Sequence, residues 1–194
     1  MNRFTTLLLG LYLSAPLAFA KDLPTLTAET GHPVLPELMG GCSMKCAFPW
    51  KVDAVEPGDG RSYNIAILND ERAAPAWMPR HASIGTKLTF HFPKKLPAEM
   101  EDNVPFYGFD IINGDWASDA KWKASARVKK ARMYYNNKPL YDVLFADTRR
   151  WQHVHFDDIM VHSSDSMTLE ILELYPGEKS APVAISELVL QGAH

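Results

Sequence analysis

Three polar side chains that could do chemistry alternate along one short segment. His153, His155 and Asp157 are separated by Val154 and Phe156. Residues i, i+2 and i+4 of a strand share one face, so two imidazoles and a carboxylate would lie together. Such a set could hold a metal ion or act on a substrate, as in a small metal-dependent hydrolase. We favour the alternative, a solvated outer strand face, because no further ligand lies nearby in the sequence.

No known catalytic motif accompanies this segment. The sequence has no nucleophile elbow, phosphate-binding loop or HExxH helix. A polar turn around Asp165 holds three serines but no base at a known spacing. We therefore expect a protein that is not an enzyme and that needs no metal or other cofactor.

Tryptophans near predicted loops and strand ends give a stronger signal, and it points to binding. Exposed rings in loops can stack on the apolar face of a sugar, while carboxylates and amides bond its hydroxyls. The candidate ligand-binding residues, in loops at one end of the fold, are Asp70, Trp77, Asn113, Asp115 and Trp116. Trp122 and Trp151 lie in similar positions. The alternative is that most of these rings close the ends of the core.

Short apolar or alternating runs predict the elements that position these residues. Leu88, Phe90 and Phe92 would share one face of a strand, and a fuller apolar run ends at the turn signal Asn113-Gly114. The predicted strands are 51–55, 85–92, 104–112, 127–135, 142–146, 153–156, 167–175 and 184–190. The best helix candidate is 119–130, although its apolar spacing is irregular. Short strands at this spacing predict an all-β fold, a β-sandwich or jelly roll.

The first twenty residues have the layout of a secretory signal peptide. Arg3 precedes an apolar stretch over 7–17, and Ala18-Phe19-Ala20 provides a small-x-small cleavage pattern. The stretch is too short to span a bilayer, and no second apolar run is long enough. We expect cleavage after residue 20, no membrane insertion afterwards, and a secreted or periplasmic protein.

Beyond residue 20, the sequence divides into two parts. Residues 21–39 contain three prolines and no clear period, which predicts an extended leader or linker. Residues 40–194 fit one domain. The chain of 194 residues has 20 basic and 23 acidic side chains and a net charge of −3. A mildly acidic surface argues against nucleic acid as a partner.

The two cysteines, Cys42 and Cys46, are close in sequence. In an exported protein such a pair usually forms a disulfide, which here would close a short loop. Zinc binding is the rival interpretation, but no histidine or further cysteine lies close by.

Several segments, in this order and spacing, match one family pattern. They are Gly41-Cys42-Ser43 with Cys46, the stretch from Tyr63 through Asp70 to Ala76-Trp77, Ile112-Asn113-Gly114, Trp122-Lys123 with Arg127-Val128-Lys129-Lys130, Ala146-Asp147-Thr148-Arg149 with Gln152, Tyr175-Pro176-Gly177, and Ala184-Ile185-Ser186-Glu187. Over residues 40–192 the chain thus resembles the NADase-type glycan-binding domain. This domain is a discoidin-related, galactose-binding-like domain, also described as the translocation domain of a secreted NAD glycohydrolase.

The resemblance implies a galactose-binding-like jelly-roll β-sandwich whose partner is a glycan or cell-surface carbohydrate. It does not imply NAD glycohydrolase activity, because the chain has no room for a separate catalytic domain. Ser125 stands where the family usually has asparagine, and Ala181-Pro182 replaces a usual acidic pair. A protein-interaction or envelope-assembly module, with an envelope protein as partner, remains an alternative because fold does not fix function.

Overall fold

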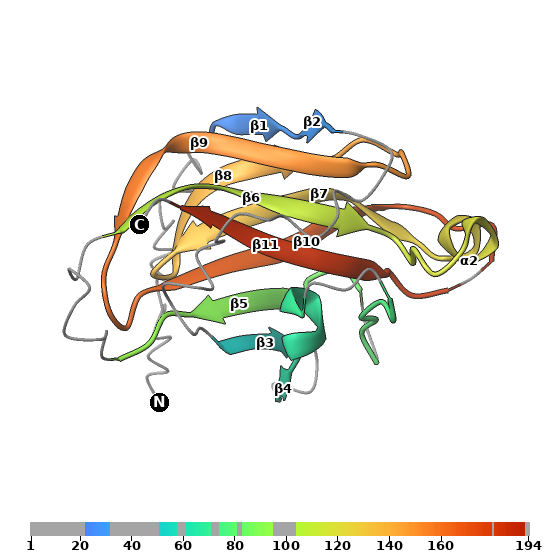
Figure 1. Ribbon diagram of the computed structural model, residues 1–194, viewed down its shortest axis with the longest axis horizontal. Coiled ribbons are helices and arrows are strands. Elements are labelled where there is room, and N and C mark those ends of the chain that lie inside the picture. Colours follow the sequence, from blue (N-terminus) through green and yellow to red (C-terminus); the bar gives the residue numbers. More distant parts are fainter. Residues whose placement is uncertain are drawn as a thin grey trace, which may run out of the picture.

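The protein is a sandwich of two β-sheets (Figure 1). The computed structural model describes residues 22–31, 51–57, 61–70, 74–80, 83–94, 104–179 and 181–192. One sheet has seven strands in the order β1-β8-β7-β10-β5-β3-β4, and the other has four in the order β11-β6-β9-β2. The predicted all-β sandwich is therefore confirmed.

The elements have the following bounds. The seven-stranded sheet contains β1 (Thr25–Thr27), β3 (Lys51–Val55), β4 (Ser62–Asn64), β5 (Lys87–His91), β7 (Arg127–Tyr135), β8 (Lys138–Leu144) and β10 (Ser166–Tyr175). The four-stranded sheet contains β2 (Glu29–Thr30), β6 (Val104–Asn113), β9 (Trp151–Val161) and β11 (Ile185–Gly192). A 3₁₀ helix, η1 (Ala66–Asn69), and the short helix α2 (Asp119–Ala124) lie outside the sheets.

The core lies between the two sheets. The predicted alternation in β5 is confirmed: Leu88, Phe90 and Phe92 are buried, whereas Lys87 and His91 are exposed. Phe106 and Phe109 from β6 are fully buried in the same cluster. Because alternate residues of each strand point inward, the opposite faces carry the polar side chains.

Part of the predicted leader belongs to the sandwich. β1 pairs in parallel with β8, and β2 pairs antiparallel with β9 of the other sheet. Between them, Ala28 is buried and its N–H donates to the Leu144 carbonyl at 2.8 Å. We call residues 25–30 the N-terminal strap because they join the edges of both sheets. These strands are too short for an alternating pattern to indicate them.

The segment predicted as a helix over 119–130 divides into two elements. Ser118 caps α2 by accepting a hydrogen bond from the Lys121 N–H at 3.2 Å. The helix ends at Ala124, and Arg127 begins β7, as the strand pattern predicted. A two-residue turn follows β7, in which Asn136 and Asn137 have φ of 48° and 63°, the left-handed geometry of tight hairpins.

Several predictions concern residues outside the described ranges. The signal peptide over 1–20 and the Cys42–Cys46 disulfide are among them, and they stay predictions. Within the described ranges, no helix is long and apolar enough to cross a membrane.

Candidate functional site

Several loops meet at the α2 end of the sandwich, beyond the ends of β6, β7, β10 and β11 (Figure 1). Trp77 and Gly114 both form bridges with Ile185, the first residue of β11, and Ala126 bridges to Val183. The segments at 74–80, 114–126 and 181–185 are therefore held to one another by backbone hydrogen bonds. We call this region the α2 end.

Trp116 is central to this end. It forms a small apolar cluster with Ile112 and Trp151, with Trp122 packed against it, apart from the main core. The Trp116 backbone N–H donates to Ser186 Oγ at 3.0 Å, and the residue is 8% exposed. The loop after β6 thus fixes the Trp116 backbone against the start of β11.

The turn into this loop requires glycine. Gly114 has a φ of +96°, and a Cβ there would lie 2.4 Å from Trp122 Cδ1. The indole N–H of Trp122 donates to the Asn113 carbonyl at 2.9 Å. Asn113-Gly114 is therefore a close-approach site as well as the predicted turn.

Arg149 covers the Trp116 ring. Its guanidinium carbon lies 4.9 Å from the ring centroid, and Nη2 donates to the Trp116 carbonyl at 2.9 Å. Nη1 pairs with Asp119 Oδ1 at 2.8 Å, and the Asp119 side chain is 77% exposed. Arg149 therefore connects the β8–β9 loop to α2 through a solvent-exposed ion pair.

Three N–H donors at this end have no hydrogen-bond acceptor within the described structure. They are the indole N–H groups of Trp116 and Trp151 and the Nε–H of Arg149, all buried. An unsatisfied buried donor is unusual in a folded protein and calls for an explanation.

Arg127 links the loops of the α2 end to one another through its hydrogen bonds. Its guanidinium makes a two-bond contact with Asp147, at 2.6 and 3.2 Å, and lies 4.5 Å from the Trp122 ring centroid. It also donates to the carbonyls of Ser125 at 2.7 Å and Pro176 at 3.2 Å. One buried cation thus ties together three loops.

The structure brings four of the five predicted site residues to the α2 end. Both the nitrogen and the oxygen of the Asn113 side chain are hydrogen-bonded within the fold. The nitrogen donates to the Val128 carbonyl at 2.7 Å, and the oxygen accepts from the Val128 N–H at 2.9 Å. Asp115 accepts from the Ala117 N–H at 3.0 Å. Trp77 is buried in the main core.

The fifth residue, Asp70, is partly buried at the end of η1, a helix that packs against β11. Sequence reasoning did not select Arg149 or the Arg127–Asp147 pair. Their signals lay in two family-like segments, Arg127-Val128-Lys129-Lys130 and Ala146-Asp147-Thr148-Arg149.

The histidine face of β9 has a different arrangement from a metal site. His153 Nδ1 lies 2.7 Å from Asp110 Oδ1, and Asp110 also accepts from Gln191 Nε2 at 2.7 Å. The His153 and His155 rings are stacked, with centroids 6.2 Å apart. Among the residues that the structure describes, no three His, Cys, Asp or Glu side chains form a group that could hold a metal ion. The hydrolase hypothesis was built on His153, His155 and Asp157, and these described residues do not form such a group.

Three solved structures with a similar fold are of ZmpB from Clostridium perfringens. A structure of its CBM32-1, CBM32-2 and M60 catalytic domains matches with a TM-score of 0.55 and 10% identity, over 90% of this chain and 17% of that one. A structure of CBM32-1 and CBM32-2 matches with 0.53 and 14% identity, over 88% and 42%. The same two domains in complex with GalNAc match with 0.53 and 12% identity, over 88% and 41%.

These likenesses concern the fold, and the chain spans less than half the length of each ZmpB structure. No curated protein matches the sequence significantly. The family comparison is more direct, because one family model matches residues 52–191, most of the chain. The match includes the loops of the α2 end. On this evidence the chain belongs to the family of NAD glycohydrolase translocation F5/8 type C domains.

Proposed function

We propose that this protein is an exported, non-enzymatic glycan-binding module whose site lies in the loops of the α2 end. Its family is a translocation and discoidin-type domain rather than a catalytic one. One of the similar ZmpB structures is described in complex with GalNAc. The signal-peptide pattern of residues 1–20 supports export.

The observation that carries this proposal is the set of three unpaired N–H donors at one end of the sandwich. Trp116, Trp151 and Arg149 supply these donors close to an aromatic surface. Sugar hydroxyl oxygens are acceptors, and the C–H face of a sugar ring stacks on indoles. A glycan provides both the missing acceptors and a partner for the rings.

Arg149 controls access to this surface in the proposed mechanism. Its guanidinium occupies the Trp116 face on which a sugar would stack. The exposed Arg149–Asp119 pair is worth only about 0–1 kcal/mol. Displacing Arg149 also breaks its hydrogen bond to the Trp116 carbonyl and its contact with the ring, which the bound glycan would have to replace. A bound glycan would take the ring face and accept hydrogen bonds from the displaced guanidinium.

The other predicted residues take different parts in the proposal. Asp115 follows the Gly114 turn and would accept hydrogen bonds from hydroxyls. Asn113 and Trp77 would position the loops, because Asn113 is engaged with Val128 and Trp77 pairs with the start of β11. Asp70 would extend the site toward η1.

The test is a glycan array with the protein from residue 21 to 194, followed by calorimetry on any hit. Arg149→Gln should weaken binding of the hit by at least about tenfold, the effect of losing a charge-assisted hydrogen bond. Trp116→Phe, which removes the indole N–H but keeps an aromatic ring, should weaken it as well.

Arg150→Gln is the matched control. Arg150 is the exposed neighbour of Arg149, and its Nη1 reaches the Gly31 carbonyl at 3.4 Å. This variant changes the net charge equally and should bind normally. Thermal unfolding of each variant separates a binding loss from misfolding. No saturable binding by the folded protein would end the proposal.

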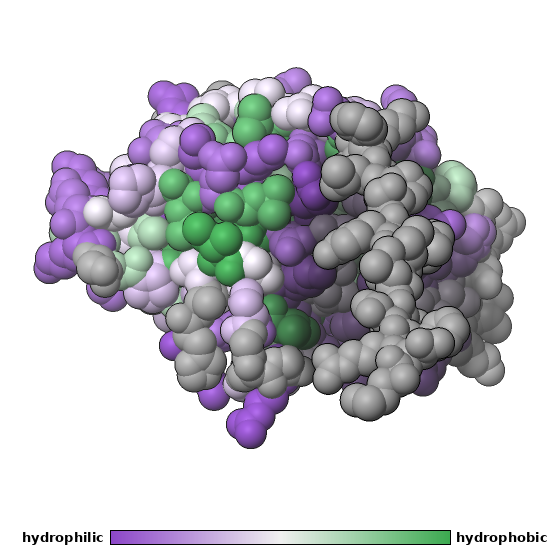
Figure 2. All heavy atoms as spheres, turned by 180° about the vertical axis from the view of Figure 1, so that it is seen from behind, coloured by the Kyte–Doolittle hydropathy of each residue, from purple (hydrophilic) through white to green (hydrophobic). Residues whose placement is uncertain are grey.

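A second candidate is a protein-interaction or envelope-assembly module on the same fold. Figure 2 shows hydrophobic residues gathered on the face opposite to the one in Figure 1. Separately, Ile84, in the segment before β5, has the largest exposed fraction among the exposed large hydrophobic residues of the described chain, 58%. Contiguous exposed apolar surface marks interaction sites. Chemical cross-linking of an envelope protein that Ile84→Glu abolishes, together with a blank glycan array, would favour this candidate.

A further inference from the structure

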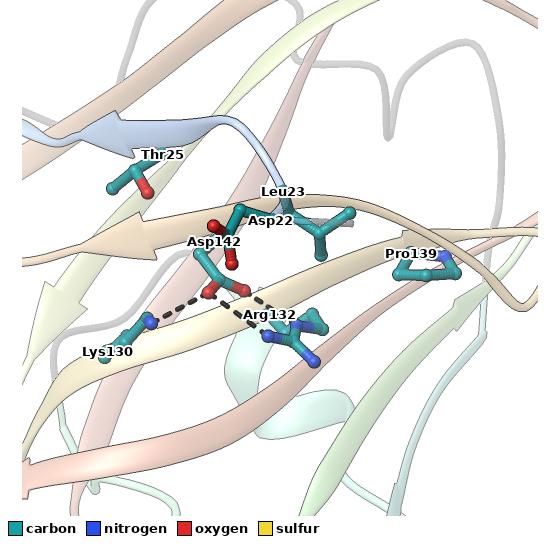
Figure 3. A pocket seen from close by; sticks show the side chains of 7 residues that line it. All are labelled: Asp22, Leu23, Thr25, Lys130, Arg132, Pro139 and Asp142. Carbon is teal, nitrogen blue, oxygen red and sulfur yellow. Dashed lines mark hydrogen bonds and ion pairs between the residues drawn. The ribbon is translucent and has the colours of Figure 1, made fainter. Parts of the chain in front are cut away.

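A pocket lies away from the α2 end, on the outer face of the seven-stranded sheet. It has a volume of about 530 Å³ and is lined by the segment leading into β1 and by β7 and β8 (Figure 3). Its lining residues are Asp22, Leu23, Thr25, Lys130, Arg132, Pro139 and Asp142. Small-molecule sites usually have volumes of roughly 300–1,000 Å³, so this pocket is large enough for a ligand.

Asp142 holds the two cations of this pocket in place. Its Oδ1 accepts from Arg132 Nε at 2.7 Å, and its Oδ2 accepts from Lys130 Nζ at 2.7 Å and Arg132 Nη2 at 3.2 Å. The Asp142 side chain is 10% exposed. These bonds use most of the acceptor capacity of Asp142, so its role is to position Lys130 and Arg132.

The two cations keep donors for another partner. An ammonium group has three N–H donors and a guanidinium has five, and Asp142 takes one from Lys130 and two from Arg132. Their side chains are 26% and 36% exposed, so they remain accessible. The lining also contains the exposed Asp22, so its two cations and two carboxylates balance. An anionic group would therefore be held by the remaining N–H donors of Lys130 and Arg132 rather than by an excess of positive charge.

The rest of the lining has complementary chemistry. Figure 3 shows Leu23 and Pro139 on the side of the pocket away from Lys130, and these two residues provide an apolar wall. Asp22 is exposed at the pocket and provides an acceptor for hydroxyl donors. Cations, an apolar wall and a separate acceptor occur together in one cavity.

We propose that this pocket binds a small hydroxylated carboxylate, with an acidic sugar such as a uronic acid as the ligand class. The carboxylate would bind to Lys130 and Arg132 in charge-assisted hydrogen bonds. The C–H face of the sugar would lie against Leu23 and Pro139, and its hydroxyls would donate to Asp22. This site is separate from the α2 end, and it does not depend on the function proposed there.

The test is an NMR titration of ¹⁵N-labelled protein with glucuronate, glucose and propionate. Glucose has the hydroxyls without the carboxylate, and propionate has the reverse. Glucuronate should shift the backbone amides of Leu23, Thr25 and Lys130, and should bind at least about tenfold more tightly than either control. Shifts that map elsewhere, or equal binding of glucose, would overturn the proposal whether or not any variant folds.

Lys129 provides a matched control on the same strand. Its Nζ pairs with Glu173 Oε2 at 2.8 Å, and it does not line the pocket. Lys130→Met should weaken glucuronate binding at least about tenfold, whereas Lys129→Met should leave it unchanged and Lys130→Arg should retain it. Equal losses in the Lys130 and Lys129 variants would contradict the proposal. Arg149→Gln should leave these pocket shifts intact, so failure at one site is distinguishable from failure at the other.

Discussion

Arg127 and Arg149 both pair with an aspartate at the α2 end, but the two pairs differ in burial. The Arg127 side chain is 8% exposed, whereas Asp119, the partner of Arg149, is 77% exposed. Water screens an exposed pair and leaves it worth little, but a buried guanidinium depends on its acceptors. The two pairs should therefore contribute very differently to stability.

Asp147→Asn should lower the free energy of unfolding by about 2 kcal/mol, because the buried guanidinium of Arg127 loses a charged acceptor. Asp119→Asn, the matched control, should lower it by less than about 1 kcal/mol. Urea unfolding of the three proteins measures both effects. Equal effects in the two variants would show that Arg127 does not depend on Asp147.

The pKa of Asp142 determines a second residue-level prediction. The hydrogen bond from Arg132, followed by that from Lys130, holds this pKa below its usual range. Because the folded pKa is depressed, the ion pair stabilises the protein above about pH 4, where an unfolded aspartate is ionised. This stabilisation is lost as the pH falls through the lower folded pKa.

Asp142→Asn should therefore be less stable than the unaltered protein at neutral pH, and the gap should narrow as the solution is acidified. Chemical unfolding at a series of pH values between neutral and strongly acidic measures the gap. A gap that stays constant over this series would mean that ionisation of Asp142 does not contribute to folding.

At the scale of elements, the N-terminal strap joins both sheets through few hydrogen bonds. Ala28→Pro removes the donor to the Leu144 carbonyl, and should destabilise the fold by about 3 kcal/mol. Ala28→Gly keeps this donor and should cost about 1 kcal/mol. Thermal unfolding compares the two variants. Similar melting temperatures of the proline and glycine variants would indicate that the hydrogen bond from the strap to Leu144 does not stabilise the fold.

The turn between β7 and β8 allows a sharper test of backbone geometry. Asn137 has a φ of 63°, which glycine adopts easily and β-branched residues adopt poorly. Asn137→Gly should be neutral or slightly stabilising, and Asn137→Val should cost about 1–2 kcal/mol. Urea unfolding would refute this reasoning if the valine variant were as stable as the glycine variant.

Several of the longer elements could be predicted from the sequence, because their patterns have a physical cause, but β9 spans Trp151–Val161 where only 153–156 was predicted. β3 and β7 have the predicted bounds, and β5 alternates as expected since one face is buried. β1, β2 and β4 have two or three residues each, too few to establish a period. Their pairing depends on β8, β9 and β3, which are specified elsewhere in the chain.

The candidate site was less predictable, because its contacts also depend on residues that are distant in the chain. The sequence selected Trp116 because tryptophan near a turn is informative by itself. Arg149 became a candidate only through its position over the Trp116 ring, 33 residues away in the chain. Asn113 had the right chemistry for binding, but its amide hydrogen bonds to Val128 depend on a register that only the fold specifies.

At the scale of the whole molecule, the small cluster around Trp116 and the main core share strands. β6 contributes Ile112 to the small cluster and Ile111 to the main core, and β9 contributes Trp151 and Val154 in the same way. Because the two clusters lie on the same strands, unfolding of one cluster should also unfold the other. We therefore expect the protein to unfold as one cooperative unit.

Tryptophan fluorescence and far-ultraviolet circular dichroism test this expectation together. Four of the five tryptophans of the chain, Trp77, Trp116, Trp122 and Trp151, lie at the α2 end, so the fluorescence reports mainly on this end, whereas the dichroism reports on the sheets. The two signals should give the same urea midpoint. A fluorescence transition at lower urea would mean that the α2 end opens separately.

The strap also determines the order in which the fold can be completed during synthesis. Thr25 and Glu29 leave the ribosome early, but their partners Asp142 and His153 are made more than a hundred residues later. The strap therefore stays without its strand partners until most of the chain has been translated. In the exported protein proposed above, the chain would pass through a translocation channel unfolded, and the sandwich would close only once β9 had reached the far side.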